Sequence, residues 1–560
     1  MEIINFIYSQ NIINFVYFIT KLQITKIVIL ENLIGDDAMY KKGSKKYKAN
    51  HPENSVDQAG TSPQTKKLTA SLEENISLFK NIFKDDQTLI TREFQNKSVK
   101  EAKCCIVYIS GMVNTEVVNE NIIQPVLRNN LAEDIDVNNL LEALMNKVIV
   151  SNDVKTETDI NKMVSSIISG DTLFILEGYD KGLIIGSVGW EKRSIAEPES
   201  SKVVRGPREG FTESLTVNLS LIRRKIQNPD LKFKFRVLGE RTHTSICICY
   251  VDGLALKEVL NELEQRLNKI KIDGILDSGY IQELIKDAPY SPFETVGAFE
   301  RPDVVASKLL EGRVALFVDG SPFVLTVPFL AVENFQASED YYNNYIFANI
   351  NRLIRGFTAV TSTTIPAIFL ALVTYHQEML PTPLLVSISS SRQGVPFPTS
   401  LSLFIMLFIF DILREVGTRM PGPVGQAVNI VGTLVLGQAA VQAKLVSAPV
   451  IIITALTGIT TLINMNIIGS TIVFRTFYLM GAAFLGIYGL LMCIIIMYLH
   501  MMSIRSFGIP YMMNNTRAKN HDGQDAWIRA PWWNMTLRPK IFSADLTRQV
   551  SNKKNGNQNK

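Results

Sequence analysis

The sequence has few of the residues that build metal sites and disulfide frameworks. Its 560 residues include 5 cysteines and 5 histidines. Cys247 and Cys249 alternate in a strand-like run and share one face of a strand, which is poor geometry for a disulfide bond. This Cys-x-Cys pair has no partner cluster, and the histidines are scattered along the chain. We therefore expect small buried thiols in a reducing compartment, and no metal site.

Motifs of nucleotide binding and hydrolysis are missing as well. The chain has no P-loop, no His-Glu-x-x-His and no Gly-x-Ser-x-Gly elbow. Gly182, Gly186 and Gly189 lie in a strand pattern with no helix after it, which does not support a dinucleotide fingerprint. His243 has no acid or nucleophile at motif spacing. The sequence predicts a protein that is not an enzyme, with no cofactor and no nucleic-acid partner.

Charge is scarce in one long tract. Charged residues make up 20% of the chain, but only eight lie between Gly356 and Ser503. A membrane-spanning helix needs roughly 20 apolar residues, and four of the five uncharged runs reach that length, whereas 393–410 is borderline at 18. We expect an all-α membrane domain with four to six spans within 311–504. The uncharged runs are 357–377, 393–410, 420–443, 445–474 and 476–504.

The ends of the chain restrict the number of crossings. The basic tail, 505–560, has ten Lys or Arg against three Asp, an excess that marks the cytoplasmic side of a membrane. The N-terminal part has no export signal and should also be cytoplasmic, so the number of crossings should be even. Five runs leave two alternatives. Either 314–333 also crosses and makes six, or 393–410 dips in and returns, leaving four.

Polar and small residues occur throughout the uncharged runs, and such residues allow close helix packing and hydrogen bonds between helices. One interpretation is a tightly packed but inert bundle, and the other is a pore or transport path. Lys444 and Arg475 stand as lone charges in this tract, where charges are costly and often functional. The candidate pore or packing residues are Thr361, Thr363, Thr364, Pro421, Gly422, Pro423, Gln426, Asn429, Gln438 and Gln442.

The N-terminal part reads as two successive α/β subdomains, at 69–190 and 191–310. Alternating runs such as 104–109 and 232–251 predict strands, and 213–227 and 256–270 have helical spacing. Residues 1–68 read as an extension and a polar, disordered lead, in which Met39 is the expected start. The fold class is therefore an α/β cytoplasmic N-terminal region of two subdomains, followed by an all-α multi-span membrane domain.

One polar segment joins the two subdomains. Arg205, Gly206, Pro207, Arg208 and Glu209 combine restricted backbone geometry with two guanidinium groups. This composition suits an ion-paired inter-domain hinge or a docking surface, while an ordinary polar loop is the simpler alternative.

Four long strings carry a specific resemblance. They are 189–226, 311–329, 413–441 and the tail string Trp-Ile-Arg-Ala-Pro-Trp-Trp-Asn-Met-Thr-Leu-Arg-Pro at 527–539. In this order they resemble the A subunit of the GerA family of spore germinant receptors, from about Ser71 to Pro539.

The resemblance implies an integral protein of the spore inner membrane, with its N-terminal domain and tail on the spore-core side. It implies a transporter-like B subunit and a lipoprotein C subunit as partners. It also implies assembly into a homo-oligomer that forms a nutrient-gated cation channel and triggers germination. A germination signal-amplifying channel of the same family, a non-conducting scaffold and a secondary transporter are the alternatives.

Overall fold

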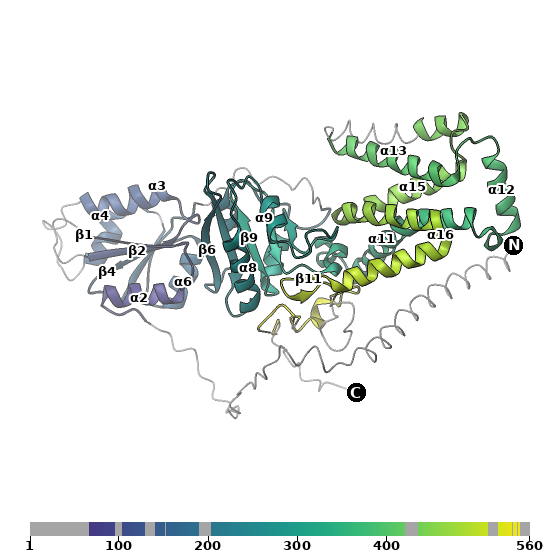
Figure 1. Ribbon diagram of the computed structural model, residues 1–560. Helices are drawn as coiled ribbons and strands as arrows, with labels where there is room; N and C mark the ends of the chain where they lie inside the picture. The colour runs from purple at the N-terminus through teal and green to yellow at the C-terminus, as the bar shows by residue number, and fades with distance from the viewer. Residues whose placement is uncertain are drawn as a thin grey trace, which may run out of the picture. The chain divides into compact units, whose positions relative to one another are not determined.

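The computed structural model describes residues 67–95, 103–128, 140–151, 153–189, 203–419, 435–512, 525–539, 541–545 and 547–548. The expected N-terminal lead up to residue 66 lies outside these ranges. Two five-stranded sheets come first along the chain, and a set of long apolar helices follows (Figure 1).

The first α/β domain is an antiparallel sheet with helices on both faces. The sheet order is β1-β2-β4-β5-β3. Alternation along β2 sends Cys104 and Ile106 to one core, and Cys105 and Val107 to the other. One core is covered by α2 (Leu72–Ile82) and α6 (Ile160–Ser169), and the other by η1 (Val118–Ile123), α4 (Gln124–Arg128), α5 (Leu140–Ala143) and η3 (Leu144–Val148), preceded by α3 (Thr115–Val117). The strands are β1 (Leu89–Gln95), β2 (Lys103–Ile109), β3 (Val154–Glu157), β4 (Thr172–Leu176) and β5 (Gly182–Ile185).

The second α/β domain repeats this arrangement with the sheet order β6-β7-β9-β10-β8. Cys247 and Cys249 share the face covered by α7 (Leu215–Lys225) and α10 (Pro302–Leu310), as their spacing predicts. The other face packs against α8 (Lys257–Lys269) and α9 (Ser278–Ile285). The strands are β6 (Leu231–Leu238), β7 (Thr244–Val251), β8 (Gly297–Phe299), β9 (Val314–Val318) and β10 (Val324–Val327).

Two sequence expectations about this region are wrong. Strands β9 and β10 belong to the second sheet, so the domain boundary placed at residue 310 is too early. The same strands show that 314–333 is not an additional span. Both strands are buried on both faces of the sheet, and a strand in that position is as uniformly apolar as a membrane segment.

The helical region begins after two short helices, η4 (Ala331–Phe335) and η5 (Ser338–Tyr341). Two segments are long and apolar enough to cross a membrane by length and composition, α11 (Tyr345–Thr374) and Met465–Ser503. Helix α13 is continuous over Thr399–Arg419, so the expectation that 393–410 dips in and returns is wrong. The other helices are α12 (Thr382–Arg392), a helix at 435–442, α15 (Ala448–Leu462) and α16 (Ile468–Ser503).

Helix α16 is a hairpin of two antiparallel legs. Tyr478 donates a hydrogen bond to the sulfur of Met497 at 2.7 Å, although a straight helix would separate these residues by about 28 Å. The reversal is at Gly486, whose φ of 60° and ψ of −139° are essentially restricted to glycine. The legs are therefore 468–485 and 487–503, about 27 and 25 Å long.

The preceding helix closes the turn of this hairpin. Tyr375 donates to the carbonyl of Ala483 at 2.6 Å, a group left without its helical partner where the first leg ends. The amide of Ile487, at the start of the second leg, donates to Nε2 of His376 at 3.4 Å. The end of α11 and the turn at Gly486 thus form one end of the helical region, which we call the far end.

The opposite end, here called the near end, adjoins the second α/β domain. Asn464, just after α15, donates to the carbonyl of Arg355 at 3.0 Å, and Ser470 donates to the carbonyl of Pro292. Helix α15 therefore runs from the far end to the near end. The loop before α13 lies at the far end too, because a Cβ on Gly394 would be 3.4 Å from Lys444.

The described helices, together with the return from Arg419 to Lys444, pass between the two ends six times. The passes are α11, α13, that return, α15 and the two legs of α16. Five uncharged runs yield six passes because Arg475, which separates two runs, lies inside the first leg. The number of passes is even, and residues 345 and 503 both lie at the near end.

Replacing Gly486 by valine tests the hairpin. A Cβ there would be 3.0 Å from both Tyr375 Cβ and His376 Nε2, and the φ of 60° is strained for any L side chain. We expect a loss of about 1–3 kcal/mol in the free energy of unfolding, measured by denaturation in detergent. Gly469→Ala is the matched control, because its Cβ would have nothing within 4 Å. Equal stability of the two variants would contradict the hairpin.

Candidate functional site

The candidate site is the junction between the second α/β domain, the start of α11 and the C-terminal tail. Asp340 lies at its centre in η5, with its side chain 2% exposed. Its carboxylate accepts a hydrogen bond from Nε of Arg352 at 2.8 Å and from Nη2 of Arg355 at 2.5 Å. The two arginines are three residues apart on one face of α11. Two charge-assisted contacts to one buried carboxylate fix the direction in which α11 leaves η5.

The tail adds a second layer to this contact. Arg352 also donates to Asp525 at 2.8 Å, and Tyr341 donates to the other oxygen of Asp525 at 2.7 Å. Arg529 donates to the backbone carbonyl of Asp340 at 2.8 Å. Asn349 and Arg529 exchange hydrogen bonds between the Asn349 amide and the Arg529 backbone. We call Asp340, Tyr341, Arg352, Arg355, Asp525 and Arg529 the junction cluster.

Burial controls the electrostatics of the junction cluster. It raises the pKa of Tyr341 well above its ordinary value, and the nearby Asp525 charge adds to the rise. Burial also raises the pKa of Asp525, although Arg352 acts in the opposite direction. Buried charges of this kind are tolerated when every partner is in place and are costly when one is lost. The cluster should therefore form or dissolve as a unit.

A second buried group ties η4 to the sheet of the second domain. Glu333 receives hydrogen bonds from Lys308 of α10, at 2.7 Å, and from Arg313 at the start of β9. Burial alone would raise the pKa of Glu333, but Arg313 and Lys308 outweigh it, so the pKa is lowered. The connection from the sheet to α11 therefore passes through charged contacts rather than a flexible linker.

A loop of the second domain meets the near end of the α16 hairpin. Ser291 shares a hydrogen bond with His500 of the second leg at 2.9 Å, and the Pro292 carbonyl accepts from Ser470 of the first leg. Phe293 stacks on Phe474 with the ring centroids 4.9 Å apart. The domain thus holds both legs of the hairpin as well as α11.

The two α/β domains are joined by a buried ion pair. Arg223 of α7 contacts Asp86 of the first domain, and both side chains are almost completely buried. Gln87 also bonds the edge strand β6, through its amide to the Phe233 carbonyl and through its side chain to the Phe235 amide. A displacement of the first domain would therefore act directly on the second sheet.

The segment 205–209, expected as a hinge or docking surface, lies against the second domain and η5. Arg301 donates to the Pro207 carbonyl at 2.8 Å, and a Cβ on Gly206 would clash with the Tyr342 ring at 2.8 Å. Glu209 pairs with Arg224 and Lys225 of α7, while Arg205 and Arg208 are exposed. These contacts place the segment beside the junction cluster, and its role as a docking surface stays a prediction.

The candidate pore residues are dispersed in this single chain. Thr361 is buried, and Thr363 and Thr364 donate to carbonyls one turn earlier in α11 itself. Gln438 and Gln442 are exposed on the helix at 435–442. Pro421, Gly422, Pro423, Gln426 and Asn429 lie outside the described residues. The structure does not gather the described members into one site, and a pore lined by them remains a prediction.

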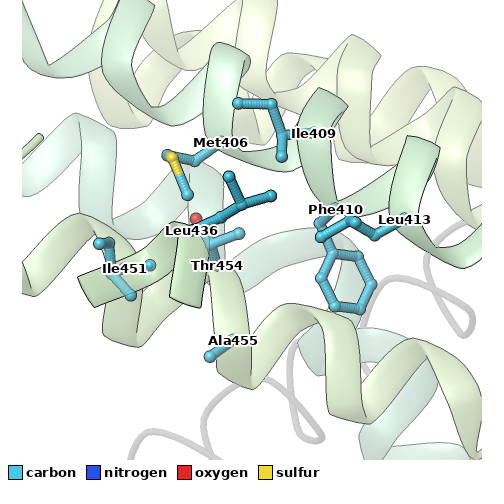
Figure 2. Close-up of a pocket in the computed structure, with 9 residues that line it drawn as sticks. Met406, Ile409, Phe410, Leu413, Leu436, Ile451, Thr454 and Ala455 are labelled. Carbon is cyan, nitrogen blue, oxygen red and sulfur yellow. The ribbon is translucent and has the colours of Figure 1, made fainter. Parts of the chain in front are cut away.

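Arg475 is not a lone charge. It forms an ion pair with Asp411 of α13, whose carboxylate also lies 3.5 Å from Arg414. A nearby pocket between α13, the helix at 435–442 and α15 has a volume of about 30 Å³ and an almost wholly apolar lining (Figure 2). A Cβ on Gly458 would be 2.2 Å from the Phe410 ring, so α13 and α15 pack closely here.

The sequence pointed to few members of the junction cluster. Arg352 and Arg355 stand on one helical face directly before a long uncharged run, which is a usable signal. Asp340 and Asp525 are far apart in the chain, and only the tail string at 527–539 drew attention to that region. Within the described ranges, no group of three or more His, Cys, Asp or Glu could hold a metal ion.

Two antiparallel α/β domains, fastened through buried charges to a helical hairpin and a long apolar helix, define a membrane-associated protein that couples domains to helices. The chain belongs to the GerA family. The family profile described as Bacillus/Clostridium GerA spore germination protein matches residues 77–541. This is the family that the four sequence strings indicated.

Individual relatives agree with the family. Spore germination protein KA of Bacillus subtilis is 41% identical over 482 residues, which cover 85% of this chain and 88% of that protein. The membrane protein YfkQ of B. subtilis is 40% identical over 483 residues, covering 86% and 93%. The crystal structure of the N-terminal domain of the A subunit of the Bacillus megaterium spore germinant receptor GerK3 is 34% identical. It covers 47% of this chain and 96% of that one, with a TM-score of 0.38.

Replacing Glu333 by glutamine tests the charged connection. Lys308 and Arg313 would stay buried without a counter-charge, so we expect a loss of about 3–5 kcal/mol in the free energy of unfolding at pH 7. The Glu333 pKa is lowered from 4.5 in the folded protein, so its contribution is present above that value and is lost as pH falls further.

The difference between the two proteins should therefore shrink on acidification, which urea denaturation at pH 7 and below pH 4.5 would measure. The control is Asp153→Asn, which removes an exposed pair with Lys155 and should cost under about 1 kcal/mol. Equal losses in both variants, or a difference that does not change with pH, would contradict the argument.

Proposed function

We propose that the chain is the A subunit of a nutrient-sensing germinant receptor in the spore inner membrane. In this proposal it assembles with further copies of itself into a nutrient-gated cation channel that triggers germination. A transporter-like B subunit and a lipoprotein C subunit are its partners. The α/β domains and the tail face the spore core, in agreement with the even number of helical passes. The names of its relatives support the receptor assignment, and one feature of α11 supports the assembly.

That feature is an exposed apolar stripe on the first part of α11. Its six residues lie on one helical face, opposite Arg352 and Arg355, and are 46–70% exposed. Buried charge on the inner face and apolar side chains on the outer face reverse the usual pattern of a surface helix. The stripe consists of Ile346, Phe347, Ile350, Leu353, Ile354 and Phe357.

The depth of the stripe indicates what covers it. The two α16 legs are about 25–27 Å long, close to the roughly 30 Å of a hydrocarbon core, and their near end is level with Arg355 and Asn464. Residues 345–356 extend about 18 Å beyond that level, and lipid tails do not reach so far. Another protein surface is then the natural cover, because contiguous exposed apolar patches mark interaction sites.

A non-conducting scaffold is the second candidate, and one observation favours it. The hydroxyls of Thr363 and Thr364 are satisfied within α11, and the pocket of Figure 2 is a small, almost wholly apolar gap. A cation path in our proposal therefore lies between copies and not through one copy. Conduction should then require assembly.

Replacing Ile350 by aspartate tests assembly and conduction together. A buried, unpaired carboxylate in the stripe should weaken self-association at least about tenfold, or about 1.4 kcal/mol, measured by light scattering in detergent. The same variant should lose the cation conductance that the wild-type chain, with its partner subunits, supports in proteoliposomes. Leu310→Asp, at an exposed site of α10 outside the stripe, is the control.

Two results would sink parts of this proposal. If the wild-type chain never raises cation conductance, alone or with its partners, the scaffold candidate replaces the channel. If Ile350→Asp associates as well as Leu310→Asp, the stripe is not the assembly surface.

A further inference from the structure

A second exposed apolar surface lies on the second α/β domain, on the side of its sheet covered by α9. Leu284 of α9 is 50% exposed and Tyr290, in the loop that follows, is 101% exposed. Tyr290 is therefore as open to its surroundings as a tyrosine can be, although its immediate neighbours Ser291 and Phe293 are held firmly by the α16 hairpin. Such a side chain needs a partner outside the chain.

The position of Tyr290 identifies the partner. Ser291, next in sequence, bonds His500 three residues before the second leg ends, and Pro292 bonds Ser470 near the start of the first leg. Both contacts are at the near ends of legs whose length matches a hydrocarbon core. Tyr290 is thus level with the boundary between lipid tails and headgroups.

The tail supplies an independent marker of the same level. A Cβ on Gly356 of α11 would be 2.7 Å from the Trp527 ring, so Trp527 lies where α11 passes the near end. Tryptophan and tyrosine are the residues that membrane proteins concentrate at this boundary, because their rings are apolar and their polar tips reach water. Two aromatic side chains from separate parts of the chain thus mark one plane.

We infer that Tyr290 and the exposed end of α9 around Leu284 contact the interfacial region of the lipid bilayer. The second α/β domain then rests on the membrane surface beside the hairpin, and the loop 288–293 is its point of support. The inference rests on the proposed insertion of the helical region in a membrane, but not on channel activity.

Spin labelling tests the contact, since all five native cysteines are buried and a single introduced cysteine can be labelled selectively. The full chain carrying Tyr290→Cys or Leu284→Cys is reconstituted into vesicles of phosphatidylethanolamine and phosphatidylglycerol. Collision of the nitroxide with oxygen, which enriches in lipid, is compared with collision with a water-soluble nickel chelate. Lys162→Cys, on the exposed side of α6, reports water, and Ile495→Cys, exposed on the second leg, reports hydrocarbon.

We expect the ratio of oxygen to nickel collisions at positions 290 and 284 to lie between the values at 162 and 495. A ratio equal to that at 162 would place Tyr290 in water and overturn the inference. Low collision with both reagents would mean that protein, such as a second copy, covers the loop, and would overturn it equally. If position 495 itself reads as water, the proposed membrane insertion fails, which separates that failure from failure of the contact alone.

Discussion

The contact of Asp340 with Arg352 and Arg355 is the interaction on which the rest of the molecule depends. It joins η5 to α11, and Arg352 and the Asp340 backbone then bind Asp525 and Arg529 of the tail. Three segments that are far apart in the sequence are thus held by one buried group of charges. Because such a group is stable only when complete, a change in the α/β domains reaches α11 as a whole.

The helical region is built around the same junction with the usual distribution of polarity reversed. Charged side chains are buried on the inner face of α11, while apolar side chains face outward on its opposite face. The loop 288–293 grips both legs of α16, and Tyr375 and His376 close the turn at the far end. The second α/β domain therefore contacts the near end of α11 and of the hairpin at the same time.

Periodicity and turn chemistry were sufficient to predict the two α/β domains and the helical tract. The pairing of Cys247 with Cys249 on one sheet face followed directly from alternation. The boundary at residue 310 failed because β9 and β10 are central strands, apolar on both faces. The number of passes could not be counted, because Arg475 interrupts the run in the middle of a leg and Gly486 reverses a helix without any charge. The junction cluster escaped because Asp340 and Asp525 approach each other only through the fold.

Hydrogen–deuterium exchange of the full chain in detergent, with and without Asp340→Asn, tests the junction most directly. If the cluster acts as one unit, the variant loses amide protection together at 331–342, at the start of α11 and at 525–535. The two central sheets should keep their protection. Loss confined to η5, with α11 and the tail unchanged, would contradict the account.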